Sequence, residues 1–521
     1  LRRPAILERL AALDRATLAF IGVLIVTTWL RIEALRLNPL GLYFDEAQYW
    51  MWSRTLEWGY FTKPPLVAWV IAATTTLFGD AEWAVRLGAV LAHAVAASAV
   101  FALGRAMYGA WPGFWAGLGW LLLPGVFLST SIISTDAVLL PLWAVALFAM
   151  WRMTTTRAWT WAVVLGAAVG FGLLAKYAMA YFFVCTALAA WWMPPVRQAL
   201  AQGRGLLATA IALALLAPNV WWNIQNGFAT ARHTADNARF NAADMFNLDE
   251  VTEFLTGQFA VVGPLVFLVL IWLVWRAARR WPGMQDQDKY LFAYILPPFA
   301  FITLIAFISR ANANWAAVAY PAIVVWITGA LFSTRGGRRV LGAATAINLA
   351  LGVAAMAIAL DPDISNRFKG VRTARLWEET ARQIAVRAVA QPGEPPFTAV
   401  MVDDRTAYFE FSYYWRHARR AGTPLPPLRM WRLYADARNS AEATDPMREA
   451  EGGRVLVVHM RSDYLPYVAG DFTVFRTVEH LTVPLGGGYS RELEISVGEG
   501  FAPAPRDAAF MRRLREQQGD D

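Results

Sequence analysis

Residues 158–193 have the sequence AWTWAVVLGAAVGFGLLAKYAMAYFFVCTALAAWWM, in which Lys176 is the one charged side chain. Two apolar stretches flank this lysine, and a helix that crosses a bilayer needs about 20 predominantly apolar residues. Similar stretches recur through the first two thirds of the chain, so the sequence predicts a polytopic α-helical membrane protein. The eleven predicted spans are 17–36, 84–107, 111–129, 136–152, 158–175, 177–193, 205–223, 255–276, 290–308, 315–333 and 340–360.

The composition divides the 521 residues into two parts near residue 360. Residues 1–360 hold 41 charged side chains and 22 of the 25 Trp, whereas residues 361–521 hold 45 charged side chains. Soluble proteins have about 25% charged residues, which fits the second part alone. We therefore expect a membrane domain over 1–360 and a soluble domain over 361–521. The single cysteine, Cys185, excludes an internal disulfide and a cysteine-based zinc site.

Lysine and arginine near the span ends predict the topology, because cytoplasmic loops carry an excess of both. The stretch 65–79 has 15 residues, and we interpret it as a re-entrant or interfacial helix rather than a span. Every second loop is then basic, which puts the N-terminus inside and the C-terminal domain outside. The span 17–36 is too long for a cleavable signal peptide, and no small-x-small site follows it. The net charge of +8 is thus a signal of topology and gives no support for a nucleic-acid partner.

Most of the unusual polar residues fall on the predicted outer side, where ionisable groups at membrane depth usually have a function. Each also has a structural alternative: Asp45, Glu46 and Asp136 could cap helices, and Lys63 and Lys176 could extend to lipid headgroups. The chain has only four lysines among 47 basic residues, so lysine at two outer positions favours a phosphate ligand. Tyr60 could belong to an interfacial aromatic belt. The remaining candidates are His233 and Arg239 in the loop 224–254, and Arg310 and Asn314 in SRANANWAAVAYP.

The order of these motifs resembles the GT-C glycosyltransferases over roughly residues 20–330. The resemblance rests on an acidic pair followed by Lys-Pro-Pro in the first outer loop (37–83), on one aspartate and one lysine at later outer loops, and on Asn-Trp before AVAYP. It is strongest to the bacterial lipid A aminoarabinose transferase and related lipid A sugar transferases, with protein O-mannosyltransferases more distant. The residues concerned are Asp45, Glu46, Lys63, Pro64, Pro65, Asp136, Lys176, Asn314 and Trp315.

The resemblance implies inverting transfer of a sugar from a polyprenyl-phosphate donor outside the cytoplasmic membrane. It also implies 11–13 transmembrane helices, juxtamembrane helices in the first outer loop, and a C-terminal periplasmic domain. The acceptor would be lipid A or another envelope glycolipid. A protein acceptor is the alternative within the family, and a lipid or sugar transporter is the alternative from another class. Transporters often have inverted repeats and sites at mid-membrane depth, and the sequence shows neither.

The chemistry of the reaction assigns roles to the candidates. The lipid phosphate leaves with negative charge, which cations stabilise in the transition state. By resemblance, Lys63 and Arg239 would bind the lipid phosphate, and Lys176 and His233 the phosphate or the sugar. A hydroxyl acceptor requires a base, for which Asp45 is the candidate, with Asp136 as a second catalytic carboxylate. A phosphate acceptor such as that of lipid A needs no base, and both possibilities stay open. The expected substrate-binding residues are Glu46, Tyr60, Lys63, Lys176, His233, Arg239, Arg310 and Asn314.

No metal or cofactor is predicted. Asp45, Glu46, Asp136 and His233 could in principle form an oxygen-rich site, but the chain has no compact acidic loop. In the C-terminal domain, apolar β-branched runs predict strands at 398–403, 454–460, 472–481 and 492–498. An apolar period near 3.6 predicts a helix within 372–390, so the domain should be α/β or α+β. Membrane lipids are expected partners, and the oligomeric state is not indicated.

Overall fold

The computed structural model describes residues 13–230, 246–389 and 393–518. The residues fall into two compact units by their internal contacts. Unit 1 comprises 1–38 and 56–357, and unit 2 comprises 39–55 and 358–521. The division near residue 358 is close to the change in composition at 360. The segment 39–55, however, packs with the C-terminal residues, although it lies within the first outer loop of the predicted membrane domain.

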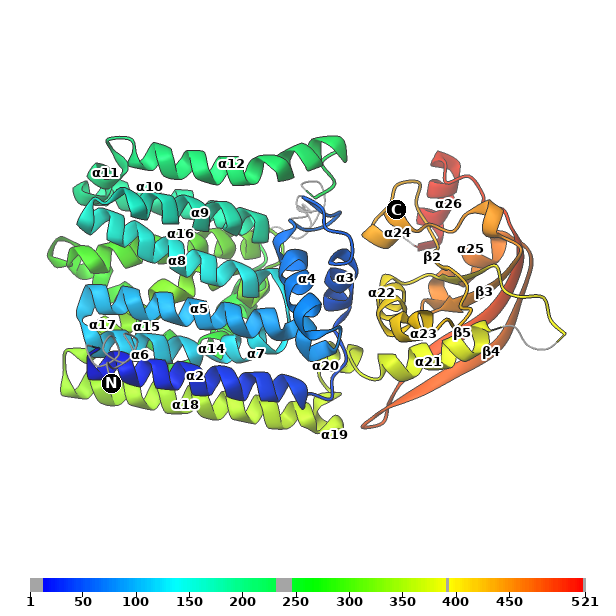
Figure 1. Cartoon of the computed structure of the whole chain (residues 1–521), viewed down its shortest axis with the longest axis horizontal. Helices are drawn as coiled ribbons and strands as arrows, with labels where there is room; N and C mark the ends of the chain where they lie inside the picture. The colour runs from blue at the N-terminus through cyan, green and yellow to red at the C-terminus, as the bar shows by residue number, and fades with distance from the viewer. Residues whose placement is uncertain (1–12, 231–245, 390–392, 519–521) are drawn as a thin grey trace, which may run out of the picture. The chain divides into compact units, whose positions relative to one another are not determined.

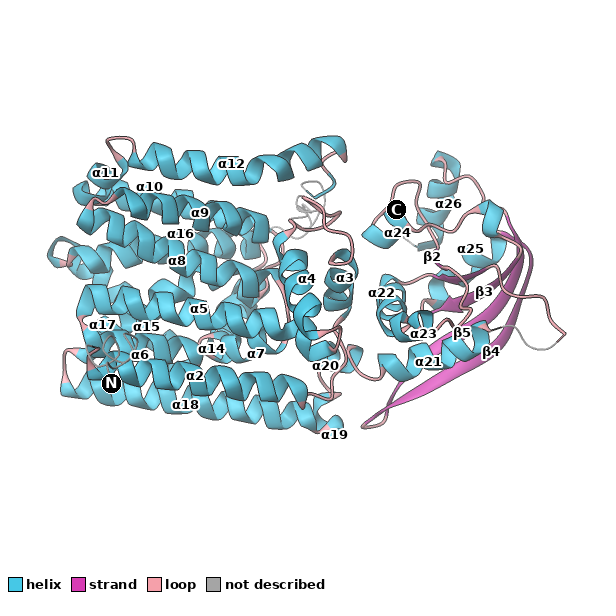
Figure 2. Ribbon diagram, in the orientation of Figure 1, coloured by secondary structure: helices cyan, strands magenta, loops and turns pink. Residues whose placement is uncertain are grey.

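Unit 1 is a bundle of helices, many of which run side by side (Figure 1 and Figure 2). Short 3₁₀ helices interrupt it at η1 (Tyr177–Ala180), η3 (Trp281–Gly283) and η4 (Ala313–Ala319). Its α-helices are α2 (Arg15–Arg36), α4 (Leu66–Phe78), α5 (Glu82–Tyr108), α6 (Ala110–Leu121), α7 (Pro124–Ser131), α8 (Thr135–Thr156), α9 (Trp159–Ala175), α10 (Tyr181–Trp192), α11 (Pro194–Leu200), α12 (Arg204–Gln225), α14 (Leu248–Val261), α15 (Pro264–Arg280), α16 (Asp286–Ile308), α17 (Tyr320–Phe332) and α18 (Arg335–Leu360).

The helices confirm the expected class of a multi-span membrane protein. Among the described residues, seven helices are long and apolar enough to cross a membrane, or up to nine if each of two bent pairs is one span. Two shorter apolar helices, Trp159–Ala175 and Tyr177–Trp192, coincide with the predicted spans 158–175 and 177–193. The stretch 65–79 forms α4, whose 13 residues are short for a span.

Two predicted spans are not continuous helices. The span 111–129 is α6 and α7, which meet at 55°, and 255–276 falls in α14 and α15, which meet at 119°. A proline begins the second helix of each pair, and Gly263 at the sharper bend has φ +95°. Each break frees a backbone carbonyl that must find a donor inside the protein. Arg31 of α2 donates to the carbonyl of Leu121, and Asn348 of α18 donates to that of Val262 at 3.0 Å.

Polar contacts join helix ends that the prediction puts on the same side of the membrane. Three such contacts connect distant helices on the predicted inner side. These are the Arg105–Asp14 ion pair, the Arg157–Gln198 hydrogen bond at 3.0 Å and the Tyr108–Asp288 hydrogen bond at 2.6 Å. The alternation of the predicted spans is consistent with these pairings.

Unit 2 is built on one five-stranded sheet in the order β2-β1-β3-β5-β4, drawn in magenta in Figure 2. β1 (Ala399–Val402) is parallel to β2 (Leu428–Met430) and to β3 (Arg454–His459). β5 (Tyr489–Phe501) is antiparallel to β3 and to β4 (Phe472–Gly486). The helices are α3 (Phe44–Trp52), α19 (Pro362–Ser365), α20 (Lys369–Thr373), α21 (Trp377–Ala388), α22 (Arg405–Tyr414), α23 (Arg416–Arg420), α24 (Ser440–Thr444), α25 (Leu465–Gly470) and α26 (Ala508–Gln518), with η5 (Glu449–Glu451) and η6 (Ser462–Tyr464).

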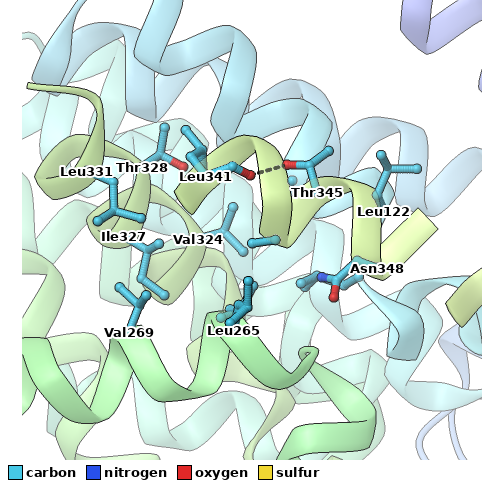
Figure 3. Close-up of a pocket in the computed structure, with 14 residues that line it drawn as sticks. Leu122, Leu265, Val269, Val324, Ile327, Thr328, Leu331, Leu341, Thr345 and Asn348 are labelled. Atoms are coloured by element: carbon cyan, nitrogen blue, oxygen red, sulfur yellow. Dashed lines mark hydrogen bonds between the residues drawn. The ribbon is translucent and has the colours of Figure 1, made fainter. Parts of the chain in front are cut away.

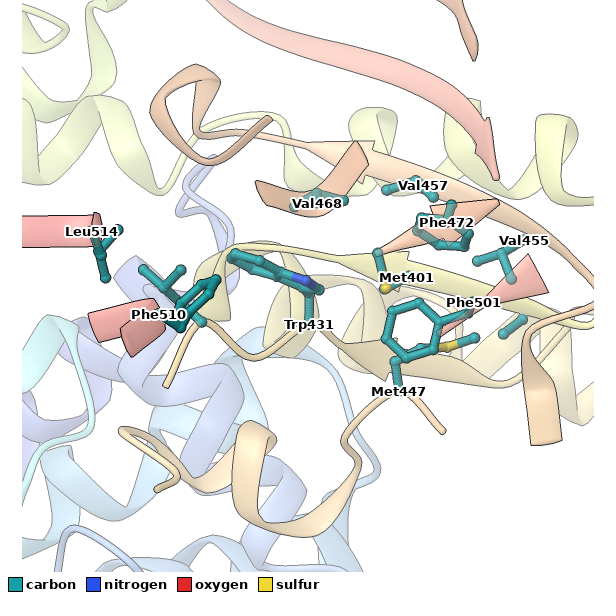
Figure 4. Packing of buried hydrophobic residues seen from close by; sticks show 12 residues of the cluster. Met401, Trp431, Met447, Val455, Val457, Val468, Phe472, Phe501, Phe510 and Leu514 are labelled. Atoms are coloured by element: carbon teal, nitrogen blue, oxygen red, sulfur yellow. The ribbon is translucent and has the colours of Figure 1, made fainter. Parts of the chain in front are cut away.

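The core of unit 2 joins the sheet to its last helix. Buried side chains from β1, β3, β4 and β5 pack with Trp431, and Phe510 and Leu514 of α26 extend the cluster (Figure 4). The predicted α/β or α+β character is confirmed, and all four predicted strands are present, β4 and β5 being longer than expected. The predicted helix begins only at Trp377, because Leu376 has a left-handed backbone with φ +53°.

Candidate active site

Three predicted residues meet in unit 1. Lys176 Nζ lies 2.7 Å from Asp136 Oδ1, and Asn314 Nδ2 donates to Asp136 Oδ2 at 3.1 Å. Asp136 is in the first turn of α8, and Lys176 directly follows α9. Because α8 and α9 are neighbours joined by a short turn, the start of α8 and the end of α9 lie at the same end of the bundle (Figure 1).

The structural alternatives for Asp136 and Lys176 do not hold. Ser134 caps α8 by accepting a hydrogen bond from Ala137 N at 3.1 Å, so the Asp136 carboxylate is not used as the cap. The Lys176 ammonium turns to Asp136 instead of extending to headgroups. Their side chains are 20% and 27% exposed, and a pair this accessible adds only about 0–1 kcal/mol to stability. The pair is therefore accessible to a ligand and of little value to the fold.

Two residues that the sequence analysis missed hold Asn314 in place. Gln258 of α14 donates to the carbonyl of Ala313 at 3.0 Å, and the Tyr320 hydroxyl donates to Gln258 Oε1 at 2.7 Å. Both side chains are buried, at 0% and 3% exposure. A glutamine and a tyrosine within apolar stretches mark these positions in the sequence, but neither is ionised at neutral pH, so the pattern of charged residues does not include them.

A second group of polar contacts connects the neighbour of Lys176 to the first outer loop. The Tyr177 hydroxyl donates to Asn219 Oδ1 at 2.9 Å and accepts from Asn223 Nδ2 at 3.3 Å. Asn219 and Asn223 lie one turn apart on α12, and Asn219 also donates to the carbonyl of Trp58 at 2.6 Å. Gly166 permits the close packing of α9 on α12, since a Cβ there would lie 2.5 Å from the Ala208 carbonyl.

Tyr60 and Lys63 lie on the segment that this network holds. Tyr60 N donates to the Lys63 carbonyl at 3.1 Å, and Thr230 donates to the Tyr60 carbonyl at 2.6 Å. The Tyr60 side chain is 6% exposed, its hydroxyl accepts from Glu57 N, and burial raises its pKa to about 12. Tyr60 thus supports the loop, whereas the Lys63 side chain is partly exposed.

The acidic pair belongs to unit 2, on α3. Glu46 is buried at 1% exposure and accepts a hydrogen bond from Tyr43 N at 2.9 Å. Glu46 therefore has the structural role at a helix start that the sequence offers as the alternative to a functional one. Asp45 beside it is partly exposed. On the following turns, Gln48 donates to Ser440 Oγ at 2.8 Å, and the ring of Trp50 packs edge-on against that of Tyr413.

The other predicted site residues do not join these groups. His233 and Arg239 lie outside the described residues. Arg310 follows α16 and is exposed. Among the described residues, no group of three histidine, cysteine or acidic side chains could hold a metal ion. The small cavity shown in Figure 3, of about 20 Å³, lies among α6, α15, α17 and α18 and is lined by apolar side chains with Thr328, Thr345 and Asn348. It has no ionisable group and room for about one water molecule.

Comparisons with known proteins show which families and folds the chain resembles. The model of the dolichyl-phosphate-mannose-protein mannosyltransferase family matches residues 62–222, which include Lys63, Asp136 and Lys176. The lipid A galacturonosyltransferase RgtD of Rhizobium johnstonii is 38% identical over 313 residues, or 59% of this chain. The match covers 65% of RgtD, slightly less than two thirds of its length.

Solved structures extend the similarity to almost the whole chain. ArnT from Cupriavidus metallidurans, in the apo state and bound to undecaprenyl phosphate, gives TM-scores of 0.60 and 0.61. Each comparison covers 94% of this chain and 99% of ArnT. The chain has a GT-C fold. At 15% and 16% sequence identity the likeness to ArnT is one of fold. Together with the family model and the 38% identity to RgtD, it confirms the expected resemblance to GT-C glycosyltransferases.

A further solved structure has a similar fold. The oligosaccharyltransferase of Archaeoglobus fulgidus, crystallised with zinc and sulfate, is 12% identical with a TM-score of 0.52. That comparison covers 90% of this chain and 72% of the archaeal protein.

Proposed function

We propose that this chain is an inverting glycosyltransferase that moves a sugar from a polyprenyl-phosphate donor to lipid A or another envelope glycolipid. The observation that carries the proposal is the accessible Asp136–Lys176 pair, held by Asn314 at one end of a GT-C bundle. The similarity to RgtD, which is named as a lipid A galacturonosyltransferase, supports lipid A as the acceptor and a uronic acid as the sugar.

The proposed chemistry breaks the bond between the sugar's anomeric carbon and the lipid phosphate. The acceptor oxygen forms the new bond from the opposite face of the sugar. Lys176 and Lys63 stabilise the negative charge that develops on the departing phosphate. In the absence of donor, Asp136 neutralises Lys176 and keeps its ammonium in position, and the incoming phosphate then competes for it. The ArnT structure with undecaprenyl phosphate supports a donor of this lipid class.

The acidic residues take the remaining roles in this proposal. With a hydroxyl acceptor, Asp45 receives the proton, and Asp136 and Asn314 position the donor. With a phosphate acceptor, no proton needs to be removed and Asp45 serves to orient the substrates. No metal enters the proposed reaction, because a lysine supplies the positive charge at the phosphate.

The proposed location is the bacterial inner membrane, with the Asp136–Lys176 pair and unit 2 facing the periplasm. Among the residues that the structure describes, seven to nine helices are long and apolar enough to cross a membrane, and the similarity to a lipid A-modifying relative also supports a membrane location. The basic residues near one set of span ends support the orientation.

Mass spectrometry of lipid A and other envelope glycolipids tests the function directly. We expect cells that lack the gene to lose a sugar-containing species, and wild-type protein to restore it. The variant Lys176→Met, expressed at the same level as the wild type, should not restore the sugar-containing species. Identical glycolipids with and without the gene would refute the proposal.

The family model that matches 62–222 is described by transfer of mannose to protein, which favours a protein acceptor as the second candidate. Glycopeptide analysis of the same cells distinguishes the two. A sugar lost from periplasmic proteins with glycolipids unchanged would favour the second candidate.

A further inference from the structure

A cavity of about 640 Å³ lies wholly within unit 2, and none of the residues given a role in the reaction above lines it. Its wall combines Trp50 and Met51 of α3 with side chains of α22, α23 and β2 and with Leu425 and Pro427. This volume is within the range of small-molecule sites, which is about 300–1,000 Å³. The cavity is therefore large enough for a sugar-sized ligand.

The charges that line the cavity are mainly positive. Three arginines, at 416, 419 and 429, face one carboxylate, Asp445. Arg429 is already paired, since its Nε and Nη2 donate to the Glu451 carboxylate at 2.7 Å and 2.5 Å, and its Nη1 lies 3.4 Å from Asp445. Asp445 is also occupied, because it accepts from the Tyr408 hydroxyl at 2.6 Å. The acids at the cavity thus have partners already.

Arg419 differs from Arg429 in having no carboxylate partner among the described residues. Its guanidinium stacks near the Trp415 ring at 5.8 Å and makes no hydrogen bond or ion pair with any residue in the described part of the chain. Desolvation lowers the pKa of Arg419 and Arg429 lowers it further, whereas Tyr408 and Asp445 act in the opposite direction. The side chain nevertheless stays accessible to solvent. A partly desolvated arginine beside a second arginine is stabilised by an anion, and its planar fork fits phosphate.

The rest of the wall suits a sugar. The partly exposed side chains of Met51 and Leu425 and the exposed Pro427 offer apolar surface for the C–H face of a pyranose. The Ser412 hydroxyl, which donates to the Tyr408 carbonyl at 2.7 Å, adds a hydrogen-bond acceptor. We propose that this cavity binds the phosphorylated sugar headgroup of the acceptor glycolipid, with Arg419 holding the phosphate. This assignment rests on the proposed function, because it takes the ligand to be that reaction's acceptor.

Two measurements on the full chain in nanodiscs test the site. The first is ligand-observed NMR with glucosamine 1-phosphate, glucosamine and inorganic phosphate as separate probes. We expect binding of the sugar phosphate, weaker binding of the other two, and loss of binding in Arg419→Ala. The control Arg420→Ala removes the same charge one residue away, outside the cavity wall, and should bind as wild type does. Melting temperatures confirm that both variants fold.

The second measurement is the KM of sugar transfer for the glycolipid and for the donor. A charge-assisted hydrogen bond contributes about 1.5–3 kcal/mol, so Arg419→Ala should raise the KM for the glycolipid about 10- to 100-fold. The KM for the donor and kcat should stay unchanged, and Arg419→Lys should recover part of the loss. A change confined to the KM of the donor would overturn the assignment.

The outcomes separate the site from the function. Binding of inorganic phosphate as tight as that of the sugar phosphate, with an unchanged KM for the glycolipid, would make this a free-phosphate site and overturn the assignment. No binding of any probe to the wild type would also overturn it. Arg419-dependent binding of the sugar phosphate by a chain that transfers no sugar would support the cavity and refute the proposed function.

Discussion

Asp136 and Lys176 each lie at a helix end, yet neither side chain is used to end its helix. Ser134 caps α8, and α9 stops where the backbone of Lys176 becomes extended. The two charged groups are thereby available to each other at 2.7 Å. In the proposed reaction, catalysis depends on a charge that the fold does not need.

The variant Lys176→Met tests this separation of stability from function. Removing a preorganised charge that stabilises the leaving group should lower kcat about 10²- to 10³-fold. The melting temperature should change little, because a pair that solvent still reaches contributes about 0–1 kcal/mol. The assay is sugar transfer by purified protein, with thermal unfolding in parallel. The control is Lys289→Met, which removes another of the chain's four lysines, at a position on the predicted inner side. Equal losses of kcat in both variants would count against the assignment.

Tyr320 supports the site without reaching it. Its hydroxyl donates to Gln258, which in turn holds the carbonyl beside Asn314, so Tyr320→Phe should loosen Asn314. We expect kcat to fall about 3- to 10-fold, because a net hydrogen bond contributes about 0.5–1.5 kcal/mol. The matched variant Tyr294→Phe loses a partly buried hydrogen bond to Thr186 and should keep its kcat. Equal kcat values in the two variants would show that Tyr320 has no positioning role.

At the scale of elements, the two helix breaks in unit 1 follow one rule. A polar side chain from a neighbouring helix donates to the carbonyl that the break leaves free, Arg31 at Leu121 and Asn348 at Val262. Such donors are necessary because no water satisfies a carbonyl inside the bilayer. The breaks are stable features, each with its own buried donor.

Replacing Asn348 by Leu tests this rule. The carbonyl of Val262 would lose its donor, which costs about 1–3 kcal/mol for a buried polar group. We expect a lower melting temperature in nanodiscs. Thr345→Val, on the same helix, removes a hydroxyl that bonds only to its own helix, and should have a smaller effect. A smaller loss in Asn348→Leu than in Thr345→Val would contradict the assigned role.

A second prediction at the scale of elements concerns the contact between α3 and the rest of unit 2. Gln48 and Ser440 form a buried hydrogen bond, and a double-mutant cycle with Gln48→Leu and Ser440→Ala should show coupling of about 0.5–3 kcal/mol. Faster hydrogen exchange in residues 39–55 of Gln48→Leu would locate the effect in α3. Additive effects of the two substitutions would show that the contact does not hold the helix.

Local patterns account for what could be predicted from the sequence. Span length and charge at span ends are properties of neighbouring residues, so the membrane class and the candidates Asp136, Lys176 and Asn314 could be found without a structure. The breaks in α6–α7 and α14–α15 depend on donors from distant helices, and no window of sequence contains both partners. β2 has three residues, too few for an alternating pattern. The attachment of α3 depends on contacts about 390 residues apart.

At the scale of the whole molecule, the alternation of basic loops predicts which residues are accessible from each side. Arg310→Cys should react with an impermeant thiol reagent added to intact spheroplasts, and Arg338→Cys only after the membrane is opened. Both positions are exposed, and the native Cys185 is buried, so the background should be low. The reverse pattern would refute the proposed orientation.

The membership of 39–55 in unit 2 also sets an order of events during synthesis. Gln48 leaves the ribosome 392 residues before Ser440, its hydrogen-bonding partner. At about 5–20 residues per second, α3 therefore waits about 20–80 s for the surface that receives it. Meanwhile the helices of unit 1 enter the membrane. The acidic pair on α3 can reach its final setting only when translation is nearly complete, so a truncated chain that has inserted correctly would still lack this part of its chemistry.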